Sequence, residues 1–157
     1  GAIPEEFRPL MGNRIYGCDD CQLACPINRQ APLTEETDFH IRPQLKQPDL
    51  LSLFAWSEAE FLKQTEGSAI RRIGHKRWLR NIAVALGNAP ASPSIIAALN
   101  ARNHSEDIDE IVREHIEWAL NAQQSRLAES AATEQQKARR KTERMVRIIE
   151  KGLPRDA

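Results

Sequence analysis

The sequence predicts an all-α fold: a loop-rich cysteine segment, then HEAT-like helical hairpins, then a polar C-terminal helix. Ala and Leu are frequent among the 157 residues and β-branched runs are few, which favours helices over strands. Ser57 and Glu60 have the spacing of a capping box that opens a helix. An apolar stripe with helical spacing follows at Leu79, Ile82, Ala83 and Leu86.

The composition changes along the chain and divides it into three segments. Residues 1–47 form the expected partial cluster-binding segment. Proline and glycine punctuate residues 1–34 of it, where no apolar period survives, so this stretch needs a cofactor or a neighbouring domain to hold it. Residues 48–124 carry the helical patterns and form the expected HEAT-like domain. Residues 125–157 are polar and are expected to form a terminal helix and tail.

Local signals predict where the helices of the middle segment begin and end. Proline opens a short helix over 48–54, and Trp56 and Phe61 form the hydrophobic staple of the next helix. A helix over about 75–86 is expected to stop at a left-handed Gly87. The later start signals are Ser92 with Pro93 and then Asp107 with Glu110. The buried face after Asp107 is expected to comprise Ile108, Ile111, Val112, His115 and Ala119, with His115 as a satisfied core residue.

A weak internal repeat supports a helical-hairpin architecture. A shift of 34 residues aligns Trp78 with Val112, Ile82 with Ile116, Ala85 with Ala119, and Leu86 with Leu120. Repeats of 30 to 40-odd residues are typical of HEAT-like units. Ordinary antiparallel helix packing produces similar matches and remains the alternative. Near the end of the chain, Met145, Val146, Ile148 and Ile149 are expected to pack.

Bulk properties exclude some classes of function. Lys and Arg equal Asp and Glu at 22 each, so the net charge does not indicate a partner. No apolar run reaches 18 residues and no signal peptide opens the chain, which predicts a cytoplasmic location without a membrane span. The start lacks Met, so we expect it to be a cut within a longer protein. Three clustered cysteines make a poor disulfide framework and indicate a metal site in a reducing compartment.

The cysteines Cys18, Cys21 and Cys25 form the pattern C-x2-C-x3-C-P, the back half of a ferredoxin-type run that binds [4Fe–4S] clusters. In two-cluster ferredoxins the cysteine before proline serves the other cluster, so Cys18 and Cys21 are expected to share one cluster and Cys25 to serve a second. The missing thiolates would come from a preceding segment. Two alternatives stay open: three unliganded thiols, or a zinc site completed by His40 or His75.

Basic residues suggest contact with nucleic acid. Residues 71–80 contain no acid and hold Arg71, Arg72, Lys76, Arg77 and Arg80, with Trp78 among them. The alternative is a solvated helix face with Trp78 in the core. A second run, interpreted mainly as solvated helix, comprises Lys137, Arg139, Arg140, Lys141, Arg144 and Arg147. An acidic block (Glu106, Asp107, Asp109, Glu110, Glu114 and Glu117) would repel RNA, which is expected to approach from the other side.

Two separate motifs, in order, resemble epoxyqueuosine reductase. The first comprises residues 3–10 (IPEEFRPL), 12–22 (GNRIYGCDDCQ) and 25–28 (CPIN). The second comprises residues 67–74 (GSAIRRIG) and 77–88 (RWLRNIAVALGN). The resemblance covers about residues 1–120 and is closest to the C-terminal part of that enzyme. Ile27 stands where Trp is frequent in the family, a position that is not a ligand.

The resemblance implies a cobalamin-dependent reductase with two [4Fe–4S] clusters that converts epoxyqueuosine in tRNA to queuosine. It implies that Cys18, Cys21 and Cys25 are cluster ligands and that Arg71, Arg72, Lys76, Arg77 and Arg80 meet tRNA. The cobalamin site, the catalytic acid and a first cysteine motif would lie in an upstream N-terminal domain, so this chain alone is expected to be inactive. The alternative function is a zinc-stapled helical RNA-binding or scaffold module without catalysis.

Overall fold

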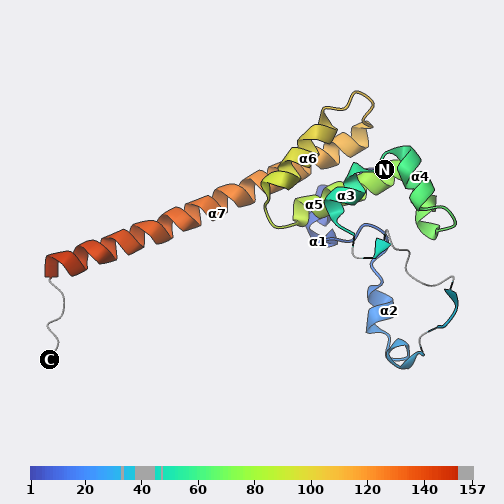
Figure 1. The fold of residues 1–157 in the computed structure, drawn as a ribbon, viewed down its shortest axis with the longest axis horizontal. Coiled ribbons are helices and arrows are strands. Elements are labelled where there is room, and N and C mark those ends of the chain that lie inside the picture. The colour runs from blue at the N-terminus through green and yellow to red at the C-terminus, as the bar shows by residue number, and fades with distance from the viewer. Residues whose placement is uncertain (33, 38–44, 47, 152–157) are drawn as a thin grey trace.

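The computed structural model describes residues 1–32, 34–37, 45–46 and 48–151, and these residues form helices and connecting loops without a strand (Figure 1). The predicted all-α class is confirmed. The elements are η1 (Glu5–Phe7), α1 (Arg8–Met11), α2 (Asp20–Ala24), η2 (Asn28–Gln30), α3 (Leu50–Ala55), α4 (Glu58–Gln64), η5 (Ala69–Ile73), α5 (Gly74–Asn88), α6 (Pro93–Asn103) and α7 (Glu110–Lys151).

Helix α5 lies at the centre of a helical body and packs mainly against α7, with α1, α3 and α4 also in contact with it. Trp78 is 1% exposed, as its predicted core position requires, and its indole Nε1–H donates to the Leu53 carbonyl at 3.2 Å. The two predicted staple residues both meet this indole: the Trp56 ring stacks on it and the Phe61 ring tilts against it, each at 5.6 Å. Trp78 therefore joins α3, α4 and α5 in one core.

The capping box at the start of α4 is confirmed. The Glu60 backbone N–H donates to Ser57 Oγ at 3.2 Å, and the Ser57 N–H donates to Glu60 Oε2 at 2.7 Å. These bonds to the Ser57 backbone and side chain lower the pKa of the Glu60 carboxyl, because they favour its charged form.

Gly87 is not the left-handed end of α5, and that prediction is wrong. The helix continues to Asn88, and Gly87 is buried inside it. A Cβ atom built on Gly87 would lie 2.5 Å from Trp118 Cζ3 and 3.0 Å from the Ala119 Cα. The glycine therefore permits close approach of α5 to α7 rather than a turn.

The start of α7 also differs from the prediction. The helix begins at Glu110, and Asp109 rather than Asp107 caps it, since Asp109 Oδ1 accepts the Ile111 N–H at 2.9 Å. On the predicted apolar face Val112, His115 and Ala119 are buried, as expected.

Helix α7 is 42 residues long and runs without interruption through residue 125. Its outer part extends away from the helical body towards the C-terminus (Figure 1). Met145, Val146 and Ile148 are 53%, 45% and 36% exposed, so the expectation that they pack is wrong in this chain. The side chain of Ile149 lies outside the described residues. None of the helices in the described ranges combines the length and apolarity needed to cross a bilayer.

All eight positions aligned by the 34-residue shift are buried in the core that α5 and α7 share. Direct packing of two helices accounts for this by itself, so the HEAT-like interpretation stays a prediction.

Candidate functional site: a cysteine arm and a basic face

Residues 12–32 form an arm that leaves the helical body and carries all three cysteines (Figure 1). Cys21 lies within α2 and Cys25 caps its C-terminal end. Cys18 stands between two left-handed residues, Gly17 (φ 64°) and Asp19 (φ 53°), which turn the chain sharply on both sides of it. Cys18 and Cys21 are exposed, Cys25 is half-buried, and all three are free thiols.

The two acidic residues between the cysteines, Asp19 and Asp20, have structural partners. The Asp19 carbonyl accepts the Leu23 N–H at 2.9 Å and opens α2. Both carboxylate oxygens of Asp20 accept hydrogen bonds from Arg14 Nη2 at 3.1 Å.

Two asparagines of α5 fasten the base of the arm to the body. The Asn88 amide donates to the carbonyl oxygens of Arg8 and Gly12 at 2.8 and 3.0 Å. The Asn81 amide donates to the Ile15 carbonyl at 2.8 Å. These bonds satisfy backbone acceptors immediately before the cysteines, in a segment with little regular structure of its own.

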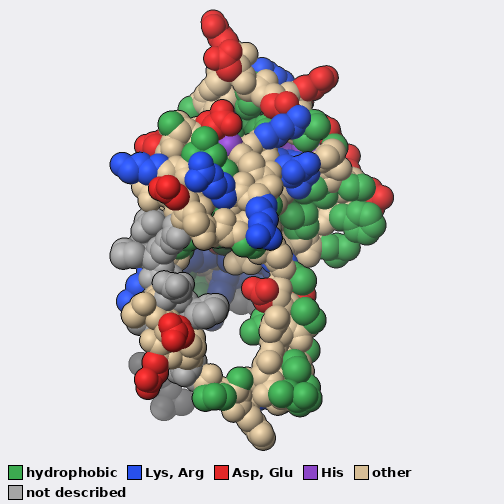
Figure 2. Space-filling view, turned by 90° about the vertical axis from the view of Figure 1, so that its right-hand side faces the viewer, with side chains coloured by type: hydrophobic (Ala, Val, Ile, Leu, Met, Phe, Trp, Pro, Cys, Tyr) green, Lys and Arg blue, Asp and Glu red, His purple; other side chains and the backbone are tan. Residues whose placement is uncertain are grey.

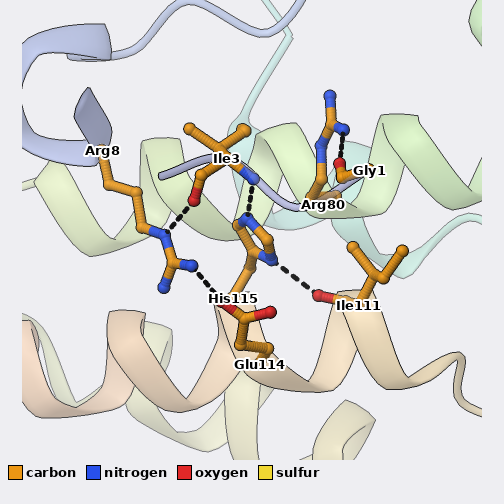
Figure 3. A network of polar contacts seen from close by, with 7 residues as sticks. All are labelled: Gly1, Ile3, Arg8, Arg80, Ile111, Glu114 and His115. Atoms are coloured by element: carbon orange, nitrogen blue, oxygen red, sulfur yellow. Dashed lines mark hydrogen bonds and ion pairs between the residues drawn. The ribbon is translucent and has the colours of Figure 1, made fainter. Parts of the chain in front are cut away.

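A buried histidine fastens the chain start in the same way (Figure 3). His115 is 0% exposed; its Nε2 accepts the Ile3 N–H at 3.0 Å and its Nδ1–H donates to the Ile111 carbonyl at 2.6 Å. Burial lowers the pKa of His115, which keeps the ring neutral and able to accept at Nε2. The prediction of a satisfied core histidine is confirmed.

The Arg8 guanidinium completes this network (Figure 3). Its Nε–H donates to the Ile3 carbonyl at 2.9 Å and its Nη2 pairs with Glu114. Arg8 itself is 4% exposed, so a buried charge is matched by a carboxylate and a carbonyl.

Sequence reasoning missed Asn81, Asn88 and Arg8 as positioning residues. Asn81 and Asn88 are seven positions apart and lie on one face of α5 beside its apolar stripe. That spacing was the available signal, but it does not show which distant carbonyls the amides meet.

The far end of the arm exposes apolar side chains. Leu23 and Ile27 are 74% and 79% exposed, and Figure 2 shows hydrophobic side chains at the lower end of the molecule, where the arm lies. Within the described ranges no three His, Cys, Asp or Glu side chains are grouped as a ready metal site.

The histidines proposed for a zinc site do not join the cysteines in the described part of the chain. His75 Nε2–H donates to the Trp56 carbonyl at 2.9 Å, and the ring lies 5.8 Å from that of Phe61 in the helical body. His40 lies outside the described residues.

The predicted basic residues lie on η5 and the first turns of α5, and Figure 2 shows Lys and Arg side chains gathered on this end of the body. Arg71, Arg72 and Arg77 are exposed. Lys76 pairs with Asp109 at 2.7 Å, and the Lys76 hydrogen bond lowers the pKa of that carboxyl. The acidic block therefore adjoins the basic residues, and the expectation that it faces the other side is wrong for Asp109.

Arg80 is the most enclosed of the basic set. Its Nε–H and Nη2 donate to Asn81 Oδ1 at 3.0 and 2.8 Å, and its Nη1 donates to the Gly1 carbonyl at 2.5 Å. Burial, and then the charge of Arg77, lower its pKa from a very high starting value. A pocket of about 250 Å³ lies beside these groups, lined by Gly1, Ile73, Lys76, Arg77, Arg80 and Ile111.

The sequence of this chain is similar to those of known epoxyqueuosine reductases. The chain is 72% identical over all of its 157 residues to epoxyqueuosine reductase of Shewanella oneidensis, and 61% identical to that of Escherichia coli. It spans 38% and 40% of the length of these curated relatives. The whole length of this chain therefore matches one part of epoxyqueuosine reductase. No family model matches it.

Solved structures give the same result. An epoxyqueuosine reductase crystallised with an epoxyqueuosine-modified tRNA-Tyr stem loop has a TM-score of 0.70 and 30% identity over 78% of this chain and 32% of its own. The epoxyqueuosine reductase of Bacillus subtilis has a TM-score of 0.70 and 31% identity, with the same coverage.

Proposed function

We propose that this chain is the C-terminal part of an epoxyqueuosine reductase, an oxidoreductase that converts epoxyqueuosine in tRNA to queuosine. The observation that carries this proposal is the identity of 72% over the whole chain, which includes the cysteine arm. A tRNA substrate and a cluster of reduced thiols are both expected in the cytoplasm, so we infer a cytoplasmic location.

Cys18, Cys21 and Cys25 would hold two [4Fe–4S] clusters jointly with thiolates of the preceding segment. The donor set fits, because thiolates are the ligands that such clusters require and these three are unpaired and at least partly exposed on one arm. The ferredoxin pattern gives Cys18 and Cys21 to one cluster and Cys25 to the other. When bound, the clusters supply electrons one at a time, and a cobalamin held by the preceding segment supplies the reductive chemistry.

Residues of the helical body hold the arm in position. Asn81 and Asn88 hold its base on α5, and His115 holds the chain start on α7. The cysteines are thereby kept beside the helical body whose basic face would receive tRNA. Because the arm is already held in place, less of its conformational freedom is lost when a ligand binds.

The basic face would meet the phosphates of the tRNA stem loop. Arg71, Arg72 and Arg77 are exposed and available to phosphate oxygens, while Arg80 and Lys76 line the adjoining pocket. A guanidinium can contact two oxygens of one phosphate, which suits the arginine-rich composition of this face. Asp109 limits the role of Lys76, because RNA would compete with an existing ion pair.

The cluster assignment is tested by iron analysis of the full-length protein after anaerobic reconstitution. Cys21→Ala is expected to lose the iron and acid-labile sulfide of one cluster, because one thiolate of its set is missing. Leu23→Ala, an exposed neighbour on α2, is the matched control and should keep both clusters. Unchanged iron in Cys21→Ala, or zinc in place of iron in the unaltered protein, would refute the assignment.

The RNA face is tested with a tRNA stem loop. The double variant Arg71→Glu/Arg72→Glu should bind it more weakly and with a log–log salt slope shallower by about 2, since two phosphate contacts are lost. Lys63→Glu/Arg139→Glu, on α4 and outer α7, makes the same change in net charge away from the face. Equal weakening by both double variants would show a general charge effect and contradict the proposed face.

A further inference from the structure

The outer part of α7, residues 128–148, does not pack against the helical body. The last anchoring side chains are Gln123, which is fully buried, and Arg126, whose Nη1 donates to the Ala89 carbonyl at 3.0 Å. Every residue from 128 to 148 is exposed. A helix this polar and this long is stabilised by something other than burial, or serves as a surface for a partner.

One side of this outer helix is strongly basic. At 3.6 residues per turn, five side chains fall within an arc of about 120°: Lys137, Arg140, Lys141, Arg144 and Arg147. Arg139 lies outside the arc and pairs with Glu143 at 3.0 Å. Lys137 pairs with Glu134 at 2.8 Å, whereas the other four members of the arc form no ion pair within the described residues.

The basic arc lies far along α7 from the basic face that η5 and α5 form. His115 of α7 belongs to the same network as Gly1 and Arg80 (Figure 3). From His115 to Arg140 the helix advances 25 residues, or about 37 Å at a rise of 1.5 Å per residue. We expect a short stem loop bound at the basic face to leave the arc free, whereas a complete tRNA continues beyond its stem loop.

The composition of the helix favours RNA over other partners. A second copy of the chain would need large apolar residues at a and d positions. The most apolar register with alternating steps of three and four residues instead runs through Ala128, Ala131, Gln135, Ala138, Thr142 and Met145. A membrane surface would need a broad apolar face opposite the charges. An arc in which four of the five cations form no ion pair within the described residues instead matches the spaced phosphates of a nucleic-acid backbone.

We propose that the arc Lys137, Arg140, Lys141, Arg144 and Arg147 binds the sugar–phosphate backbone of tRNA outside the anticodon stem loop. This inference rests on the proposed function, because it extends the same RNA-binding surface. The contact is independent of sequence, since a phosphate carries no base identity. Through this contact the outer helix would bind a complete tRNA more tightly than the isolated stem loop.

The test measures binding of the full-length protein to a complete tRNA and to its isolated stem loop at several salt concentrations. Arg140→Gln/Arg144→Gln keeps helix propensity and removes two charges of the arc. Affinity for complete tRNA is expected to fall about 10-fold at low salt, with a slope shallower by about 2, while stem-loop affinity is unchanged. Arg139→Gln, outside the arc on the same helix, should leave both affinities unchanged.

Several results would overturn the inference. Equal binding of complete tRNA by the double variant and the unaltered protein would remove the arc from the RNA surface. If the double variant loses the same affinity for the isolated stem loop, the arc contacts the stem loop itself and not the rest of the tRNA. Dimerisation of the unaltered protein in sedimentation, abolished by the double variant without a change in RNA binding, would assign the helix to a second copy. Failure of the unaltered protein to bind either RNA would instead refute the proposed function.

Discussion

Replacing Asn88 by Ala should loosen the base of the cysteine arm without unfolding the helical body. The change removes two half-buried hydrogen bonds, to the carbonyls of Arg8 and Gly12 at 2.8 and 3.0 Å. At about 0.5–1.5 kcal/mol each, their loss destabilises the arm by about 1–3 kcal/mol. Local opening should therefore become about 5- to 150-fold more frequent.

Hydrogen exchange at the base of the arm measures this opening directly. The Gly12 N–H donates to Pro9 and the Arg14 N–H donates to Met11, at 3.4 and 3.2 Å, so both amides report on the arm. Their exchange should accelerate by the stated factor, whereas amides of α5 and α7 should not change. Anaerobic iron content is expected to fall with it, because cluster formation needs the cysteines held in place.

Asn121→Ala provides the matched control, since Asn121 is exposed on α7. If the Gly12 and Arg14 amides exchange within twofold of that control, the Asn88 bonds do not hold the arm and the reasoning fails. Faster exchange throughout α5 would instead show that Asn88 supports the whole body.

Two further predictions concern the core. Gln123→Leu should lower the free energy of unfolding by about 1–3 kcal/mol, because the Ser92 N–H loses its acceptor, while the Leu86 and Ala89 carbonyls keep other donors. Gln124→Leu, at an exposed position, should change the free energy of unfolding by less than about 0.5 kcal/mol in the same denaturant titration. Equal effects of the two variants would contradict a stabilising role for the Gln123 hydrogen bonds. The stabilisation from His115, measured as the difference from His115→Gln, should be complete above about pH 6.5 and decline as pH falls towards the lowered folded pKa, because the unfolded chain then binds more protons. A difference that grows on acidification would refute a neutral His115.

The local elements were predictable because their causes lie within a few residues. The capping box of Ser57 and Glu60 and the core position of Trp78 follow from spacing alone, and both are confirmed. Gly87 shows where this reasoning stops. A glycine after an apolar stripe is typical of a helix end, but here the approach of Trp118 from another helix requires it.

The polar anchors could not be predicted, because each joins residues far apart in the chain. Asn88 meets a carbonyl 80 positions away, and Ile3 meets His115 across 112 positions. The prediction for the acidic block failed for the same reason. Asp109 caps α7 and Lys76 lies on α5, and the packing of these two helices brings the side chains together.

By itself the sequence determined the helical class, the cysteine spacing and the arc of cations along the last helix. These features depend on local periodicity, and on chemical character that each side chain carries wherever it lies. Only the tertiary structure decided which carbonyls hold the cysteine arm, which cations are already paired, and that α7 continues beyond the body. Those outcomes depend on how separate helices pack, and no short stretch of sequence contains that information.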